Sequence, residues 1–150
     1  MKRVTSVFAL LLILAIATPA WAGPAEEVTD IINKRAQYFS EGNLDAWMAT
    51  YADNANFLAA RNPFRIEGKE AIRAFYTALF QNFPTRRTAA RQLTLRAYGN
   101  DSTVVSNQYT QVNFVDKNGQ ATNLYLRNTI TWVKMGGQWS IVDAHNSKLP

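Results

Sequence analysis

Four long runs rich in β-branched and aromatic residues fill the second half of the chain, at residues 88–98, 103–116, 120–135 and 138–147. Short turns separate them, at Gly99-Asn100-Asp101, Lys117-Asn118-Gly119 and Gly136-Gly137. Turns this short join antiparallel neighbours, because a parallel neighbour needs a much longer crossover connection. The sequence therefore predicts a meander of long strands in one sheet.

Apolar residues recur at helical spacing three times before these strands. The sets that share a face are Val28, Ile31, Ile32, Ala36 and Phe39; Leu44, Trp47, Met48 and Tyr51; and Ile72, Phe75, Tyr76 and Leu79. We expect the second helix to end at Asp53-Asn54 and a short strand to follow at residues 55–60. Helices followed by long antiparallel strands predict an α+β domain, in which three N-terminal helices cover one face of a curved antiparallel sheet.

The first 22 residues have the pattern of a secretory signal peptide. Basic Lys2 and Arg3 precede an apolar run at residues 7–17, and small residues flank Trp21 before the expected cleavage after Ala22. An uncleaved anchor is the less favoured alternative, because a membrane span needs about 20 apolar residues. We therefore expect a single domain at residues 23–150, periplasmic or extracellular after cleavage, with no stable membrane anchor.

The charge and the cysteine content limit the partners that this domain can bind and the covalent cross-links that can stabilise it. The chain carries a formal charge of +5, of which Lys2 and Arg3 supply two, and its remaining basic residues are scattered. No Lys/Arg tract predicts a nucleic-acid surface. The chain has no cysteine, so disulfides cannot support the fold.

The two longest strands carry residues to bury on both faces. In the strand at 103–116, one face holds Asn107 and Tyr109 and the other holds Val104 and Val112; the strand at 120–135 alternates similarly around Asn128. Such a sheet can bury its second face against another subunit, which predicts a homodimer or larger homo-oligomer. The polar residues can instead line a pocket between sheet and helices, or lie at exposed edges, and the alternation leaves these readings open.

Several segments form a recognisable pattern: the ending Gly137-Gln-Trp139-Ser-Ile141-Val142-Asp143-Ala-His145-Asn-Ser147, the run Gly42-Asn43-Leu44-Asp45 with Tyr51-Ala52-Asp53-Asn54-Ala55, and residues 68–76. In these segments the chain resembles the nuclear transport factor 2-like superfamily. Within the superfamily it is most similar to secreted bacterial SnoaL-like and SgcJ/EcaC-type proteins, akin to the association domain of calcium/calmodulin-dependent protein kinase II. The resemblance implies a cone-shaped, cystatin-like fold that hosts isomerases, cyclases, dehydratases, binding proteins and assembly domains.

The resemblance also bears on individual residues. It implies that Trp139, Ile141, Val142, His145 and Ser147 shape the last strand beside a pocket mouth or a subunit interface. The kinase association domain lines its pocket with arginines, and the corresponding positions here hold Tyr109, Ile130 and Asn146. Many relatives carry a second histidine at the position of Ala144.

Asp143 and His145 are the candidate catalytic residues, because they lie two apart on one strand face and can share a proton with a tyrosine such as Tyr51 or Tyr109. A structural histidine and a surface aspartate are the alternative. The candidate ligand-binding residues are Trp47, Tyr51, Asn107, Tyr109, Arg127, Asn128 and Asn146. We expect no metal site, since one histidine with Asp143 falls short of the usual ligand number, and no cofactor.

Three functions follow as hypotheses. The first is an exported domain that binds a small organic ligand in a partly apolar pocket and oligomerises through its sheet. The second is a cofactor-independent isomerase, cyclase or dehydratase of the ketosteroid isomerase-like kind, with Asp143 and His145 as the proton-transfer pair. The third is a pure oligomerisation module.

Overall fold

The computed structural model describes residues 23–150, so the predicted signal peptide lies outside the described residues. The elements are α1 (Pro24–Glu41), α2 (Leu44–Ala49), β1 (Tyr51–Leu58), β2 (Ile66–Glu67), α3 (Lys69–Asn82), β3 (Thr85–Tyr98), β4 (Thr103–Val115), β5 (Ala121–Met135) and β6 (Gln138–Lys148). The α+β class with N-terminal helices is confirmed. Within residues 23–150, no helix is both long and apolar enough to span a bilayer.

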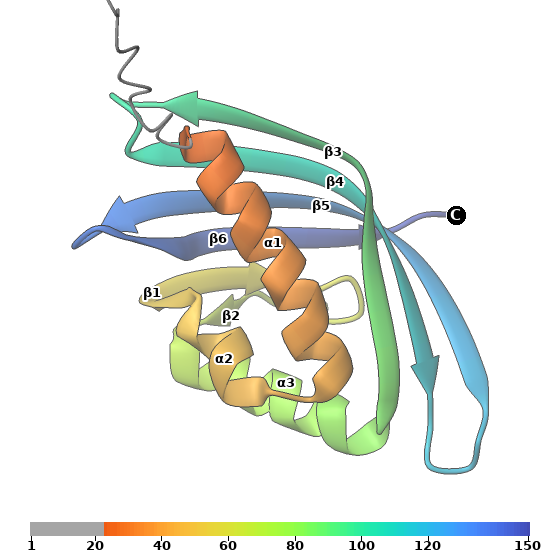
Figure 1. The fold of residues 1–150 in the computed structure, drawn as a ribbon. Helices are drawn as coiled ribbons and strands as arrows, with labels where there is room; N and C mark the ends of the chain where they lie inside the picture. The colour runs from red at the N-terminus through yellow and green to blue at the C-terminus, as the bar shows by residue number, and fades with distance from the viewer. Residues whose placement is uncertain (1–22) are drawn as a thin grey trace, which may run out of the picture.

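The six strands form one sheet in the order β2-β1-β6-β5-β4-β3. Strands β3 to β6 make the predicted antiparallel meander, whereas β1 pairs with β6 in parallel, so the sheet is mixed rather than purely antiparallel. The long strands bend, the sheet stays open at β2 and β3, and the helices lie on its inner face (Figure 1). This curvature leaves a space between α1, α3 and the sheet that side chains only partly fill.

Helix α1 has clear start and stop signals. Pro24 occupies its first turn with Glu26 and Glu27, where carboxylates suit the helix dipole. Gly42 ends it at φ 79°, in the left-handed conformation that glycine adopts without steric strain. Buried Val28, Ile32, Arg35 and Phe39 form its inner face. Of these four residues only Arg35 is charged.

Helix α2 ends earlier than expected, at Ala49, so the prediction that Tyr51 is helical is wrong. Tyr51 begins β1 and pairs with Ile141 of β6, and the Ile141 amide donates to the Thr50 carbonyl at 2.8 Å. This distant pairing overrides the helical spacing, which is a local signal. The strand expected at residues 55–60 therefore starts four residues sooner.

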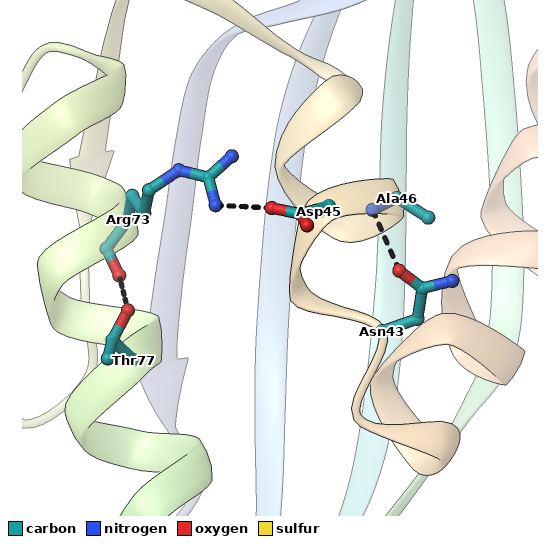
Figure 2. A network of polar contacts seen from close by, with 5 residues as sticks. All are labelled: Asn43, Asp45, Ala46, Arg73 and Thr77. Carbon is teal, nitrogen blue, oxygen red and sulfur yellow. Dashed lines mark hydrogen bonds and ion pairs between the residues drawn. The ribbon is translucent and has the colours of Figure 1, made fainter.

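Polar contacts fix α2 between its neighbours (Figure 2). The Asn43 side chain caps the helix by accepting from the Ala46 amide at 3.1 Å, and Asp45 pairs with Arg73 of α3 at 2.7 Å. Both contacts are exposed, so each adds little stability alone. Together they orient α2 so that Trp47 faces α1 and α3.

The register separates the two faces of the sheet. Buried residues of β4 alternate at Val104, Ser106, Thr110, Val112 and Phe114, and they face the helices with buried residues of β5 such as Trp132 and Asn128. Asn107, Tyr109 and Arg127 alternate onto the outer face. The alternation found in the sequence is confirmed, and the face that carries Val104 and Val112 is the one that meets the helices.

Candidate functional site

A cavity of about 200 Å³ lies between the helices and the inner face of the sheet. Its walls come from α1, α2, α3 and all four long strands, and most lining residues are aliphatic or aromatic. Phe39, Trp47 and Tyr76 pack edge-on or tilted, with the Phe39 and Trp47 centroids 5.3 Å apart and the Trp47 and Tyr76 centroids 5.2 Å apart. Rigid aromatic walls of this kind suit a small organic molecule.

Arg35 of α1 lines this cavity and is only 5% exposed. Its guanidinium lies over the Trp47 ring, 3.7 Å from the ring centroid, and 5.0 Å from the centroid of Tyr51. It donates to the Trp47 carbonyl, the Thr50 hydroxyl and the Tyr51 hydroxyl. Among the ion pairs of residues 23–150, none involves Arg35. The cavity wall therefore carries a buried positive charge held by neutral groups.

Two tyrosine hydroxyls extend the row of polar contacts that begins at the Arg35 guanidinium. The Tyr51 hydroxyl lies 3.4 Å from Arg35 Nη2 and 3.4 Å from the Tyr76 hydroxyl. Burial, followed by the influence of Tyr51, raises the pKa of Tyr76 well above its ordinary value. Tyr76 is thus a neutral phenol, able to donate a hydrogen bond, throughout the physiological pH range.

A row of three amides crosses the opposite wall. Gln108 of β4 is paired with Asn128 of β5, and Asn128 with Asn146 of β6, and all three line the cavity. Asn128 is 8% exposed; its amide nitrogen donates to the Thr110 hydroxyl, but its Oδ1 has no hydrogen-bond partner within the described chain. Gln108 Oε1 is buried and lacks a partner in the same way. Buried polar atoms are normally hydrogen-bonded, so two buried acceptors without a partner set this row of cavity-lining amides apart.

The structure brings four of the predicted ligand-binding residues into this cavity. Trp47 and Tyr51 lie on the helical side, and Asn128 and Asn146 on the sheet. The other three, Asn107, Tyr109 and Arg127, lie on the outer face, where they line a separate depression with Thr94 and Thr129. The predicted ligand-binding residues thus divide between the cavity and the outer face of the sheet.

Asp143 and His145 are also placed on the outer face of the sheet. Their neighbours Ala144 and Asn146 line the cavity, and alternation along β6 turns Asp143 and His145 away from it. His145 is exposed and is paired with Thr129. The predicted pair does share a face, but its position gives no support to proton transfer inside the cavity.

The predicted set did not include Arg35, Tyr76 or Gln108, which also line the cavity. The position of Arg35 in the sequence indicates the buried face of α1, since Arg35 follows Val28 and Ile32 and precedes Phe39 at helical spacing. Gln108 could be found only from its register with Asn128. Within the part of the chain described, no group of three His, Cys, Asp or Glu side chains is placed to hold a metal ion.

A curved, open sheet whose inner face is covered by N-terminal helices defines the nuclear transport factor 2-like class, and solved structures agree. A nuclear transport factor 2-like superfamily protein of Salmonella enterica serovar Typhimurium matches with a TM-score of 0.74 and 21% identity, over 83% of this chain and 89% of that one. A Xanthomonas campestris protein proposed to be a calcium/calmodulin dependent protein kinase II association domain matches with a TM-score of 0.77 and 22% identity, over 89% and 93%. At such identities the likeness shows the fold.

Within this class, the chain belongs to the calcium/calmodulin dependent protein kinase II association domain family, whose profile matches residues 24–150. The resemblance found in the sequence is therefore confirmed. A proposed scytalone dehydratase of Novosphingobium aromaticivorans shares the fold with a TM-score of 0.75 and 12% identity, over 82% of each chain. A comparison with the curated proteins gave no significant match.

Proposed function

We propose that this domain binds a small, mostly apolar organic molecule in the cavity between its helices and its sheet. The observation that carries the proposal is the cavity itself, because an aromatic enclosure with a few convergent polar groups is the usual form of a ligand site. Those polar groups are a guanidinium, phenols and amides, which bind and orient ligands through hydrogen bonds. The signal-like leader supports export, so we place this binding outside the cytoplasm.

Filling the cavity tests the proposal. Ala90 of β3 lines the cavity, whereas its neighbour Ala89 alternates onto the outer face. Native mass spectrometry of the protein from its exported fraction is expected to show a retained small molecule in the wild type and in Ala89→Leu, and none in Ala90→Leu. Equal retention by both variants would contradict binding in this cavity.

Self-association through the outer face is the second part of the proposal. Tyr109 and Tyr125, on neighbouring strands, are 43% and 53% exposed there, which is unusual for large aromatic residues. Membership of an association-domain family supports assembly of this kind. In a sedimentation series Tyr125→Glu should shift the protein toward monomers, and the matched change Phe64→Glu, at an exposed aromatic residue in the loop between β1 and β2, should not. A wild type that stays monomeric at every concentration would refute this part.

An enzyme of the isomerase or dehydratase kind is the alternative that one observation favours. Arg35, Tyr51 and Tyr76 form a chain of donors in a low-dielectric site, and such donors can stabilise an oxyanion. The fold shared with the proposed scytalone dehydratase is compatible with this chemistry. Turnover of the retained molecule, lost in Tyr51→Phe but not in Asp143→Asn, would establish the enzyme and place its chemistry in the cavity.

A further inference from the structure

We infer that the outer face of the sheet carries a second binding site, which takes acidic sugars such as the uronic acid residues of a polysaccharide. The site is a depression of about 400 Å³ on the face opposite the helices (Figure 1). Six of its lining residues are exposed and carry polar side chains: Gln92, Thr94, Asn107, Tyr109, Arg127 and Thr129. The inference does not depend on ligand binding in the inner cavity.

The outer face is strongly basic. Arg87, Arg91 and Arg96 of β3 are exposed on it, and so is Arg127 of β5. Against them, Asp143 is the only carboxylate residue in the sequences of β3 to β6. None of the four ion pairs in the described part of the chain involves any of these arginines. An anionic partner therefore supplies the charge that this face lacks.

Two of these arginines flank an aromatic ring. Tyr109 of β4 is paired with Arg91 on one side and with Arg127 on the other, so the three residues form one row across the sheet. Neighbouring strands lie about 4.8 Å apart, which places the two arginines about 10 Å from each other across Tyr109. The tyrosine is 43% exposed. Its ring can pack against the apolar face of a pyranose while the guanidinium groups on either side bind carboxylates of successive sugars.

The adjoining row of the depression offers hydrogen bonds to sugar hydroxyls. Asn107 Oδ1 accepts from the Thr129 hydroxyl at 2.9 Å, so the amide nitrogen is the donor that Asn107 has available. Gln92 joins this row from a bulge in β3, where Gln92 and Leu93 lie opposite the single residue Gln108. Gln92 has φ 47°, in the left-handed region that residues other than glycine rarely occupy. Such strain is characteristic of functional positions, and bulges re-aim side chains beside binding sites.

A nucleic acid is the other polyanion that a basic face with exposed aromatic rings can bind. The lining favours the saccharide, because its amide and hydroxyl groups match the many hydroxyls of a sugar. The predicted secretory leader favours it as well, since polysaccharides are the common polyanions outside the cytoplasm. The experiment therefore includes an oligonucleotide.

Titration of the wild type with hexagalacturonate, with its methyl ester, and with an oligothymidylate of six phosphates tests the inference. The protein is kept at concentrations where sedimentation shows its lowest oligomeric state, because self-association through Tyr125 would compete for this face. We expect hexagalacturonate to bind at least roughly tenfold more tightly than either of the other two compounds, since each exposed ion pair contributes roughly two- to fivefold.

Single substitutions place the site. Arg91→Gln and Arg127→Gln should each weaken hexagalacturonate binding roughly two- to fivefold. Lys34→Gln is the matched control, because it removes the same charge from an exposed position on α1, and it should leave the affinity unchanged. Tyr109→Ser should weaken binding, whereas Tyr109→Trp, which keeps an aromatic ring, should retain it.

Four outcomes would overturn the inference. They are no binding of hexagalacturonate, equal binding of its methyl ester, tighter binding of the oligothymidylate, and an equal loss in Lys34→Gln and the arginine variants, which would mean attraction by net charge alone. The three compounds are compared on the wild type, so the first three outcomes do not depend on whether a variant folds. Retention of a small molecule in the inner cavity is tested separately by Ala90→Leu, so either proposal can fail while the other stands.

Discussion

The guanidinium carbon of Arg35 lies 3.7 Å from the centroid of the Trp47 ring, so a charge from α1 is held against an aromatic residue from α2 inside the domain. Helix α2 has six residues and buries only Met48 fully, yet it places Trp47 beside both Arg35 and Tyr76. A short helix thus positions the polar end of the cavity.

Arg35→Met is expected to leave the free energy of unfolding unchanged or to raise it by about 1 to 3 kcal/mol. Replacing buried ionic groups by apolar residues of similar volume has this effect where the charge is poorly compensated. The Thr50 hydroxyl and the Trp47 carbonyl keep their mutual hydrogen bond. Urea denaturation without ligand measures the change, and a loss above about 2 kcal/mol would mean that Arg35 holds the fold together.

Gly42→Ala should destabilise the domain more than Gly119→Ala does. Both glycines have positive φ, 79° and 81°, so both substitutions impose backbone strain of about 1 kcal/mol. A Cβ at Gly42 would in addition collide with the guanidinium of buried Arg86, whereas a Cβ at Gly119 would meet open space. Arg86 Nη1 donates to the Phe83 carbonyl at 2.7 Å, just beyond α3.

Chemical denaturation of the two glycine variants isolates this collision, because the strain is common to both. We expect Gly42→Ala to lose roughly 1 kcal/mol or more beyond the loss of Gly119→Ala, through displaced Arg86 hydrogen bonds. Equal losses would show that Arg86 can move aside freely.

The meander was predictable from the sequence because its information is local. Turns such as Gly136-Gly137 leave no length for any connection but a hairpin, and β5 and β6 follow. The parallel pairing of β1 with β6 was not predictable in this way. Tyr51 and Ile141 lie far apart in the sequence, so no local spacing shows that Tyr51 leaves the helix.

The site was only partly predictable, for two physical reasons. Alternation shows that Asp143 and His145 share a face, but it does not show which face meets the helices, and the helices cover the other one. An arginine in an amphipathic helix normally faces water, so Arg35 gave no sign of being buried except its spacing from Ile32 and Phe39. Asn128 and Asn146 were found because polar residues among apolar ones are conspicuous.

Ser106→Ala should cost about 1 to 3 kcal/mol of stability, because it leaves the buried Trp132 indole N–H without an acceptor. Both side chains are 0% exposed, and Trp132 Nε1 donates to Ser106 Oγ at 3.0 Å. A double-mutant cycle with Trp132→Phe isolates the pair: once the indole is gone, the further change Ser106→Ala should cost clearly less. If it costs the same in both backgrounds, the hydrogen bond contributes nothing.

Glu27 should make the domain less stable in acid. Its carboxylate accepts from Lys134 Nζ at 2.7 Å and from Trp139 Nε1 at 2.6 Å, so the first turn of α1 is tied to β5 and β6. Lys134 and then Trp139 lower the pKa of Glu27 below its ordinary value of 4.5. A group whose folded pKa lies below its unfolded pKa stabilises the fold above the unfolded value, and that stabilisation is lost as the pH falls through the folded value.

Glu27→Gln should therefore be less stable than the wild type near neutral pH, and the difference should shrink as the pH falls below about 4.5, where the wild-type carboxylate becomes protonated. Glu70→Gln is the matched control, since Glu70 is exposed in the first turn of α3. Thermal unfolding of the three proteins between about pH 7 and pH 3 measures the effect. Parallel stability curves for the wild type and Glu27→Gln would show that the contacts with Lys134 and Trp139 do not favour the ionised carboxylate in the folded protein.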